Sequence, residues 1–230
     1  MIDMHTHILP GIDDGSKSVE MSLEMLQRSA RQGVSTVVAT PHFYPRYNAP
    51  ERFLEERAAA VERLGELPEE YPQLILGAEV AYYDGMRRSE ELSSLQIGDT
   101  GMILIEMPFH SWTPRMMDEL RDLQANLGLT PVLAHVNRYL GHKQFFHYCQ
   151  WMEERGILFQ CNTEAFMRIV SRRRMLKLLK QGKLHFLGSD THDLDSRGPN
   201  MGKAAKIITQ KLGRETLEEM TAFGAQMLDL

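Results

Sequence analysis

The feature that most constrains the fold of this chain is a regular alternation of short apolar, β-branched runs with longer helical patterns. The short runs predict seven strands, over residues 2–7, 34–41, 74–80, 102–107, 131–136, 157–162 and 184–189. The longer patterns predict helices over residues 19–32, 50–67, 113–127, 144–155 and 164–181, at best a short helix over 86–95, and a last helical region over 203–230 with a break near Gly213. Because strands that alternate with helices form a parallel sheet, we expect an α/β protein.

Closure of that sheet into a barrel is the architecture we expect. The competing architecture is an open doubly wound sheet, which is expected to carry a Gly-rich phosphate loop after its first strand, and the sequence has none there. A single α/β barrel needs about 200 to 250 residues, and the chain has 230. We therefore expect one domain over residues 1–230. Left-handed helix caps are expected one or two residues before four of the strands, at Gly33, Gly128, Gly156 and Gly182.

The composition argues against several classes of protein. The net charge is −5 with histidine neutral, so no global field favours nucleic acid as a partner. The two cysteines, Cys149 and Cys161, indicate a reducing compartment and no disulfide framework. No basic-then-apolar leader opens the sequence, and no apolar run approaches the roughly 18 residues of a membrane-spanning helix. These features predict a cytoplasmic protein without a transmembrane segment.

Acidic residues and histidines recur where the predicted strands end. His5 and His7 are alternate residues of the first strand, so their side chains share one face and can grip one divalent metal. Asp190 and His192 repeat this spacing after the last strand, which is the neighbour of the first strand in a closed barrel. Parallel barrels build their active sites at this end of the strands. The complete set of candidate ligands is His5, His7, Asp14, His42, Glu79, Glu106, His135, Asp190 and His192.

These nine groups suffice for two or three metal ions, because one carboxylate can bridge two ions. Mixed histidine and carboxylate ligands suit Mn, Fe or Zn better than Ca, and the absence of cysteine from the set argues against a structural thiolate zinc site. The alternative for any single histidine is an ordinary hydrogen-bonding role. Glu79 and Glu106 are harder to explain in that way. Each closes an apolar run, where a carboxylate needs a cation or hydrogen bonds to offset its desolvation.

The same residues resemble the motifs of the PHP (polymerase and histidinol phosphatase) superfamily, and most closely its bacterial manganese-dependent protein-tyrosine phosphatases of capsule and exopolysaccharide loci. That branch opens with M-I-D-x-H-S-H followed by D-D-G, and this chain has M-I-D-M-H-T-H and then D-D-G at 13–15. Further matches, spread over essentially the whole chain, are Thr40-Pro41-His42, Gly77-Ala78-Glu79, Leu104-Ile105-Glu106, Ala134-His135 with Arg138-Tyr139, and Ser189-Asp190-Thr191-His192. The resemblance implies a distorted (β/α)7 TIM-like barrel.

The resemblance also implies how the ligands are shared among two or three divalent ions, with Mn²⁺ as the expected metal and Fe or Zn as alternatives. The first ion is expected to take His5, His7, Glu79 and Asp190. Glu79 would bridge to a second ion, held also by Glu106 and His135. The third ion is expected to take Asp14, His42 and His192. The family motif points to Asp14 rather than its neighbour Asp13, and Asp3 is then a supporting or structural group.

Two arginines and one substitution complete the comparison with the family motifs. Arg138 and Arg197 match arginines that grip the substrate phosphate. His192 is a candidate general acid, with a metal-bound water as the alternative. Asn137 stands where the family usually has the glutamate of its H-x-E-R-Y motif. This substitution leaves the ligand set intact but removes a charge beside it.

These features predict a phosphoric monoester hydrolase that acts on phosphotyrosine in proteins by in-line attack of a metal-activated water. The resemblance implies a membrane-associated bacterial tyrosine kinase of polysaccharide export as the substrate, and leaves the oligomeric state open, with a homo-oligomer as one option. The alternative with the same chemistry is a small-molecule phosphomonoesterase such as a histidinol-phosphatase, although those relatives are typically longer. The alternative of another class is a non-catalytic metal-binding scaffold, which is expected to have lost ligands or arginines that this chain keeps.

Three further features are less specific. Cys149 and Arg155 satisfy the C-x5-R pattern of cysteine-based tyrosine phosphatases, but the residues between them are helical in pattern and include two acids and no glycine. A catalytic Cys149 is therefore not expected.

Six basic residues between 168 and 180 predict a solvated helix face, with a docking surface for an acidic partner or membrane headgroups as the alternative. The aromatic, basic loop 42–47 either lines the approach of a tyrosyl substrate or covers the barrel mouth.

Overall fold

Nine strands, all paired in parallel, form the sheet of this protein in the computed structural model, which describes residues 1–142 and 144–230. Each of the seven predicted strands is present; the third is divided, and the second is followed by a further short strand. The strands are β1 (Ile2–Thr6), β2 (Thr36–Ala39), β3 (His42–Phe43), β4 (Gln73–Leu76), β5 (Glu79–Ala81), β6 (Met102–Glu106), β7 (Thr130–Leu133), β8 (Leu158–Asn162) and β9 (Phe186–Gly188).

The predicted third strand is interrupted, so the expectation that it is continuous was wrong, and the predicted second strand ends early with a further short strand beyond it. Pro41, which has no N–H to donate to a ladder, separates β2 from β3, and Gly77 lies between β4 and β5. Backbone hydrogen bonds nevertheless continue across both breaks. The Gly77 N–H donates to the Ala39 carbonyl at 2.8 Å, and the Glu79 N–H donates to the Pro41 carbonyl at 3.0 Å. The breaks therefore redirect the two strands without separating them.

The sheet curls so that its last strand lies beside its first. The strand order is β1-β2-β4 in one part and β3-β5-β6-β7-β8-β9 in the other. The Asp190 N–H donates to the His5 carbonyl at 2.8 Å, and the His7 N–H donates to the Thr191 carbonyl at 3.0 Å. Thr6 and Thr191 form a parallel bridge. The expected neighbourhood of the first and last strands is confirmed, and we call the end where the strand carboxyl ends gather the mouth.

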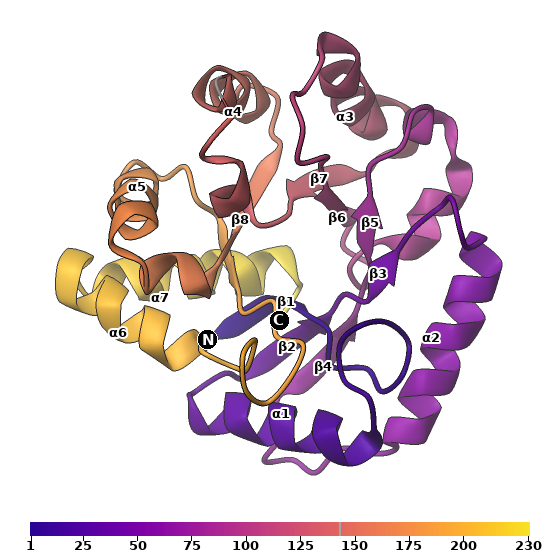
Figure 1. Ribbon diagram of the computed structural model, residues 1–230, viewed down its shortest axis with the longest axis vertical. Helices are drawn as coiled ribbons and strands as arrows, with labels where there is room; N and C mark the ends of the chain where they lie inside the picture. Colours follow the sequence, from indigo (N-terminus) through magenta and orange to yellow (C-terminus); the bar gives the residue numbers. More distant parts are fainter. Residues whose placement is uncertain (143) are drawn as a thin grey trace.

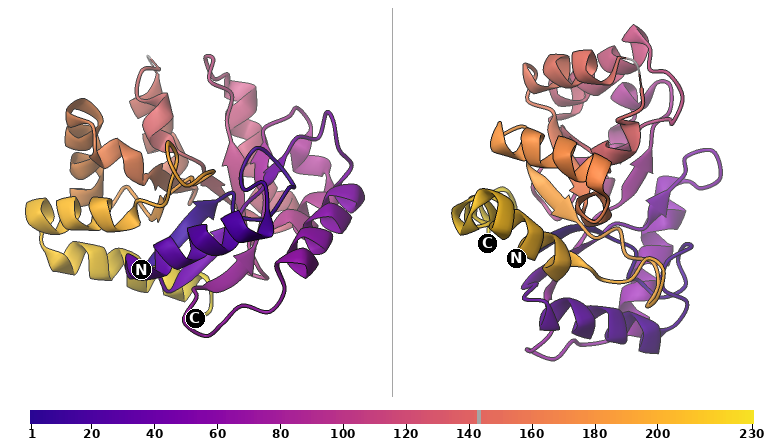
Figure 2. Two further views of the ribbon diagram at one scale, coloured as in Figure 1. Left: turned by 60° about the horizontal axis from the view of Figure 1, so that its bottom comes forward. Right: turned by 60° about the vertical axis from the view of Figure 1, so that its left-hand side comes forward.

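Helices surround the curled sheet on its outside (Figures 1 and 2). They are α1 (Val19–Arg31), α2 (Pro50–Leu64), α3 (Pro114–Leu127), α4 (Phe145–Glu153), α5 (Ile169–Lys180), α6 (Met201–Leu212) and α7 (Arg214–Met227). Short 3₁₀ helices are η1 (Met86–Arg88), η2 (Glu90–Leu95), η3 (Val136–Tyr139) and η4 (Thr163–Phe166). The single helix predicted over 164–181 is thus divided into η4 and α5. Within the described residues, none of the helices has the length and hydrophobicity that a bilayer crossing requires.

Glycines with positive φ end several helices where the sequence predicts caps. The break between α6 and α7 falls at Gly213, whose φ is 98°, so the predicted interruption is confirmed. The other four predicted caps also adopt positive φ, with 82° at Gly33, 69° at Gly128, 71° at Gly156 and 68° at Gly182. A residue without a Cβ adopts this conformation at little cost, which explains glycine at these positions.

Two groups of buried side chains hold the sheet and helices together. The larger group joins the helices to the sheet and includes Leu26 of α1, Phe53 of α2 and Leu120 of α3. The smaller group contains side chains from five strands, and Leu228, just after α7, closes it. Its members are Ile2, Met4, Val38, Ile97, Met102, Leu104, Val132, Ala134, Phe186 and Leu228. Side chains of β2, β6 and β9 meet in one cluster only because the sheet is curled.

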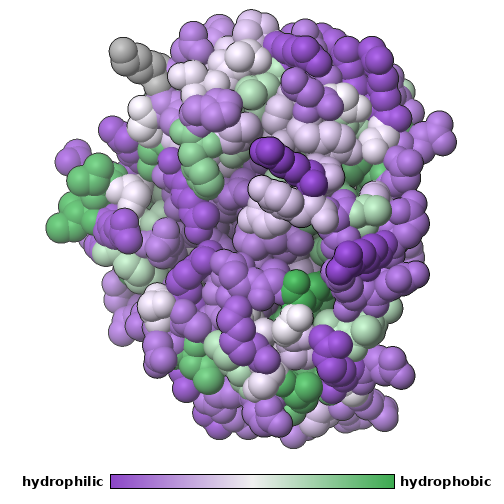
Figure 3. All heavy atoms as spheres, turned by 45° about the vertical axis from the view of Figure 1, so that its right-hand side comes forward, coloured by the Kyte–Doolittle hydropathy of each residue, from purple (hydrophilic) through white to green (hydrophobic). Residues whose placement is uncertain are grey.

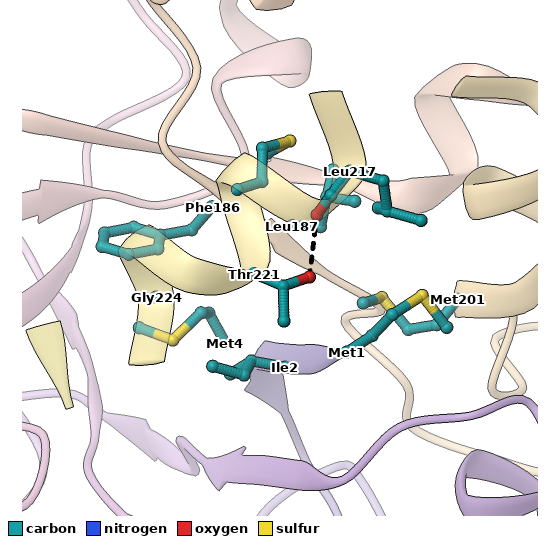
Figure 4. A pocket seen from close by; sticks show the side chains of 10 residues that line it. Met1, Ile2, Met4, Phe186, Leu187, Met201, Leu217, Thr221 and Gly224 are labelled. Carbon is teal, nitrogen blue, oxygen red and sulfur yellow. Dashed lines mark hydrogen bonds between the residues drawn. The ribbon is translucent and has the colours of Figure 1, made fainter. Parts of the chain in front are cut away.

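Helix α7 packs against the amino-terminal ends of β1 and β9, away from the mouth (Figure 4). Gly224 permits this close approach, because a Cβ there would lie 3.2 Å from Cδ1 of Ile2. Thr221 donates its hydroxyl to the Leu217 carbonyl at 2.8 Å within the helix. The apolar gap that remains is about 20 Å³, which is room for about one water molecule. This gap is a packing defect rather than a ligand site.

Gly188, the last residue of β9, has no room for a side chain. A Cβ at this position would lie 2.6 Å from Cβ of His5 and 2.5 Å from Nε2 of Gln160. We predict that Gly188→Ala lowers the free energy of unfolding by about 1–3 kcal/mol, because one extra methyl group must displace its neighbours. Urea denaturation measures the change. Gly141→Ala is the matched control, since a Cβ there meets nothing within 4 Å; equal stability of the two variants would contradict the packing argument.

Candidate metal centre

The nine candidate ligands converge at the mouth of the curled sheet. Two of them have positions in the strands that differ from the prediction. His42 and Glu79 are the first residues of β3 and β5, rather than residues that follow a strand, because the strand breaks move them to the mouth. The remaining seven lie in, at the end of, or after strands: His5 in β1, Glu106 at the end of β6, and His7, Asp14, His135, Asp190 and His192 in the segments that follow β1, β7 and β9.

Glu79 lies at the centre of this group, and its side chain is only 1% exposed. Its Oε2 atom is 3.1 Å from Nε2 of His5, 3.3 Å from Nε2 of His7 and 3.0 Å from Nδ1 of His42. Its Oε1 atom is 2.9 Å from Nε2 of His135. One buried carboxylate is therefore in contact with four imidazoles, which come from the β1, β3 and β7 regions of the sheet.

Three clusters of donor atoms surround Glu79. In the first, Nε2 of His5 and Nε2 of His7 are 3.1 Å apart, and Oδ1 of Asp190 lies 3.7 and 3.6 Å from them. In the second, Oε1 of Glu106 is 3.2 Å from Nε2 of His135, which also contacts Glu79. The first group brings together three of the four ligands expected for the first ion, while Glu79 and Glu106 also offer donor atoms close to His42, which was expected to hold the third ion.

The third cluster lies on the open side of the mouth. Oδ1 of Asp14 is 3.5 Å from Nε2 of His42 and 3.3 Å from Nε2 of His192, and His7 also offers a donor atom to this group. The Asp14 side chain is 64% exposed, whereas the His192 side chain is buried. An ion held here would be the one most accessible to solvent and substrate.

The donor atoms fit divalent cations. Two ligand atoms about 2.1 Å from one ion, at angles of roughly 90–110°, lie about 3.0–3.4 Å apart, close to the separations in these clusters. Within residues 1–142 and 144–230, Nδ1 of His42, Oε2 of Glu79 and Nε2 of His192 have polar neighbours at 3.0–3.3 Å but form no hydrogen bond of good geometry, and Nδ1 of His135 has no hydrogen-bond partner. Unpaired buried polar atoms are costly, and bound cations would satisfy those that face a cluster.

Burial and neighbouring charge set the protonation of these groups. Burial alone would raise the pKa of Glu79, but the surrounding histidines, His5 foremost, outweigh it and hold that pKa well below its usual range. Burial alone would lower the pKa of His5, but the charges of Glu79 and Asp190 raise it. Burial and the charge of His7 lower the pKa of His192 to about 4. His192 is therefore neutral at pH 7, as a metal ligand must be.

Two supporting side chains hold the histidine rings in place, and sequence reasoning missed their roles. Asp13 contacts Nδ1 of His7 through Oδ2 at 2.7 Å and accepts the His42 N–H at 3.0 Å. Gln160 contacts Nδ1 of His5 through Oε1 at 3.2 Å and accepts the His135 N–H at 2.7 Å. Such partners orient metal ligands and fix their tautomers. The signal for Gln160 was present, since it and Asn162 are alternate polar residues in an otherwise apolar strand.

Both predicted phosphate-binding arginines contact Asp190. Nη2 of Arg138 donates to Oδ2 at 2.5 Å, and Nη2 of Arg197 donates to Oδ1 at 2.7 Å. The arginine side chains are 32% and 39% exposed, so part of each guanidinium faces the mouth. Asn162 also donates to Oδ2 of Asp190 at 2.6 Å, and the Asn137 side chain accepts the Asn162 N–H at 2.8 Å. Asn137 therefore supports Asp190 through one intermediate residue.

Backbone strain is concentrated at the same site. Only three residues other than glycine have positive φ in the described part of the chain, and two of them are candidate ligands, His135 at 34° and Asp190 at 53°. Such conformations cost on the order of 1–3 kcal/mol each and persist where surrounding structure enforces them. Gly15 shows a related constraint, because a Cβ there would lie 2.1 Å from the His7 carbonyl oxygen. The Asp-Asp-Gly loop is thus folded tightly against His7.

Aromatic rings border the centre on two sides. Tyr44 stacks on His42 with ring centroids 5.1 Å apart, and it lines a cavity of about 480 Å³ that includes Asp14 and His42. Phe109 stacks on His135 at 5.8 Å and lines a second cavity of about 640 Å³. His42, Tyr44 and Tyr47 of the loop 42–47 thus line the cavity beside the third cluster. On the face shown in Figure 3, hydrophilic residues predominate and hydrophobic ones occur in small groups.

The pattern around Cys149 does not form a thiol active site. Burial, followed by the charge of Glu153, raises the pKa of Cys149 to about 12, so its thiol is not ionised near neutral pH. Cys149 lies on α4, and Arg155 lies in the turn just after that helix ends at Glu153, so the two do not frame a loop curled around an anion. The Arg155 guanidinium stacks on the Trp151 ring at 4.1 Å. The expectation that Cys149 is not catalytic agrees with this geometry.

A curled parallel sheet with histidine and carboxylate clusters at the strand carboxyl ends defines an α/β protein with a candidate multi-metal centre. A family model described as "Capsular polysaccharide synthesis, CpsB/CapC" matches residues 1–228. The chain therefore belongs to the CpsB/CapC family, which agrees with the resemblance seen in its motifs.

Similar proteins and structures agree with this assignment. The tyrosine-protein phosphatase CpsB of Streptococcus pneumoniae is 32% identical over 96% of this chain and 94% of its own length. The tyrosine-protein phosphatase YwqE of Bacillus subtilis (strain 168) is 31% identical over 99% of this chain and 91% of its own length. A solved structure, from crystal structures of B. subtilis YwqE and S. pneumoniae CpsB described as unique metal-dependent tyrosine phosphatases, is 26% identical with a TM-score of 0.84, and covers all of this chain and 94% of that one.

The response of stability to metal should depend on pH. In the metal-free protein, the pKa values of His5, His7, His42 and His135 are raised above 6.5. The stabilisation that comes from their protonated rings is therefore complete below about pH 6.5 and is lost as the pH rises through the folded-state pKa. Metal binds the neutral rings and its contribution therefore grows with pH. We predict that the increase in Tm on adding Mn²⁺ to chelator-treated protein is small near about pH 5.5 and large near about pH 8. An increase that is independent of pH would contradict histidine ligation.

Proposed function

We propose that this chain is a metal-dependent protein-tyrosine phosphatase, a phosphoric monoester hydrolase whose catalytic domain spans residues 1–230. The observation that carries the proposal is the convergence of the donor clusters around the buried Glu79, next to two half-exposed arginines. The relatives named tyrosine-protein phosphatases match this chain over nearly its full length. We further propose that the nine strands correspond to the seven staves of a distorted (β/α)7 barrel, with β2 continued by β3 and β4 continued by β5.

In this proposal the three clusters hold two or three divalent ions, of which Mn²⁺ is the expected one. His5, His7 and Asp190 hold the first, Glu106 and His135 the second, and Glu79 lies between them. Asp14, His42 and His192 hold a third. When bound, such ions lower the pKa of a coordinated water and neutralise charge on phosphate oxygens. The protein keeps the donors fixed through the side chains of Asp13 and Gln160.

Substrate binding falls to residues at the rim of the centre. Arg138 and Arg197 present planar guanidinium groups suited to two-point contact with phosphate oxygens. Tyr44 and Phe109 offer apolar ring faces beside the histidine ligands. A phenolate leaves comparatively well, since the pKa of free tyrosine is about 10. A dedicated general acid is therefore less necessary, and the low pKa of His192 favours its role as a ligand.

The proposed substrate is a phosphotyrosine segment of a protein, and specifically of a membrane-associated bacterial tyrosine kinase of polysaccharide export. An extended, disordered tail can reach a recessed centre that a folded surface cannot. The two buried cysteines, Cys149 and Cys161, are free thiols, which supports a reducing, cytoplasmic location. The alternative function is hydrolysis of a small phosphomonoester such as histidinol phosphate. It predicts the same metal chemistry with a different substrate preference.

Chelator-treated protein assayed on a phosphotyrosine peptide, with and without Mn²⁺ and beside histidinol phosphate, tests this proposal. We predict metal-dependent release of phosphate from the peptide and a preference for it over histidinol phosphate. A preference for histidinol phosphate over the peptide would contradict the proposed substrate but not the metal-dependent mechanism. Metal binding without turnover of either compound would favour a non-catalytic scaffold.

Two variants separate the metal mechanism from a thiol mechanism in the same assay. Asp14→Ala removes a ligand of the exposed cluster and should reduce turnover by more than about 100-fold while the protein stays folded. Cys149→Ser is the control and should leave turnover unchanged. A folded Asp14→Ala protein with full activity, or a folded Cys149→Ser protein with none, would overturn the proposed mechanism.

A further inference from the structure

The charge of this chain is strongly segregated. The segment 165–189 carries seven of the 26 basic residues and none of the 31 acidic ones. The remainder therefore has 19 basic and 31 acidic residues. Helix α5 occupies most of the basic segment. A local positive field on a negatively charged protein indicates a specific anionic partner rather than general solubility.

The exposed face of α5 combines this charge with apolar side chains. Met175, Leu178 and Leu179 are buried against the core, so the opposite face points outward. On that face Ile169 is 74% exposed and Val170 is 71% exposed, at the first turn of the helix. Basic residues follow them at helical spacing on the same side, at Arg173, Arg174, Lys177 and Lys180.

Little of this charge is neutralised within the protein. Arg172 donates to the carbonyls of Phe166 and Met167, and so caps the end of η4. Arg168 has Glu164 at 4.0 Å. Arg173, Arg174, Lys177 and Lys180 have no acidic partner within 4.0 Å among residues 1–142 and 144–230.

The surface extends across a cavity onto α4, which lies next to α5 on the outside of the sheet (Figure 1). The cavity is about 450 Å³ and is lined by Arg174, Lys177 and Lys183, with Gln150 and Gln181 as further polar groups. Glu153 is its one acidic lining residue and is already paired with Lys183 at 2.8 Å. Phe146, at its edge, is 57% exposed. The cavity therefore offers cationic groups and an apolar edge side by side.

We propose that this α4–α5 surface binds an anionic phospholipid bilayer. Exposed aliphatic residues surrounded by arginine and lysine are typical of helices that lie in the membrane interface, with the apolar side chains inserted among acyl chains and the cationic groups at the phosphates. Lysine, which this surface carries at Lys177 and Lys180, is instead depleted in protein–protein interfaces. The cavity between α4 and α5 takes a lipid phosphate. This surface is separate from the proposed phosphatase centre, and the inference goes beyond that function.

Co-sedimentation of the full chain with vesicles tests the proposal. We expect binding to phosphatidylcholine vesicles that contain phosphatidylserine, weak binding to phosphatidylcholine alone, and loss of binding at high salt. Arg173→Glu with Lys177→Glu should weaken binding by more than about tenfold, and Ile169→Ser with Val170→Ser should weaken it severalfold. Arg115→Glu with Arg121→Glu on α3 is the matched charge control and should bind as the unmodified protein does.

Melting curves of each variant show that it is folded, and hydrolysis of a soluble phosphotyrosine peptide should be unchanged in all of them. Equal binding to both kinds of vesicle, or equal loss in the α3 control, would overturn the proposal. Retention on a polyglutamate resin without vesicle binding would also overturn it and assign the surface to an acidic protein. Vesicle binding by a protein without phosphatase activity would contradict the proposed function and leave this inference standing.

Discussion

The contact between the buried Glu79 carboxylate and four imidazoles is the interaction on which the rest of the structure depends. A carboxylate that is 1% exposed would cost several kcal/mol without cationic partners. His5, His7, His42 and His135 surround it from three regions of the sheet, and in the proposed function the divalent cations that these rings hold supply the positive charge. The curl of the sheet, the return of β9 to β1 and the breaks after β2 and β4 all serve to bring these groups within about 3 Å of one carboxylate.

Much of this arrangement could be predicted from the sequence. Strand and helix periodicity located the elements, and the position of acids and histidines at strand ends identified the groups that meet at the mouth. The breaks were not predicted, although Pro41 and Gly77 are residue types that often interrupt strands, because the point where the pairing changes shows only in the ladder contacts. The supporting role of Asp13 was also hidden, since adjacent acids look alike until the fold places one beside His7 and exposes the other.

The site and the proposed membrane surface divide the charge of the molecule between them. In the proposed function, the acidic donors at the mouth hold divalent cations, and Arg138 and Arg197 bind the substrate phosphate. The basic face of α5 lies outside the sheet, and Arg173, Arg174, Lys177 and Lys180 have no acidic partner within 4.0 Å in the described part of the chain. A protein built in this way can bind a surface with one face and keep its metal centre free for a flexible substrate segment.

The most direct test of the central claim is anomalous X-ray diffraction at the manganese absorption edge from crystals of Mn²⁺-loaded protein. The account predicts anomalous peaks at the mouth, one among His5, His7, Glu79 and Asp190 and one or two more among the remaining candidate ligands. Well-ordered crystals of Mn²⁺-activated protein with no peak at the mouth, or with peaks elsewhere, would contradict it.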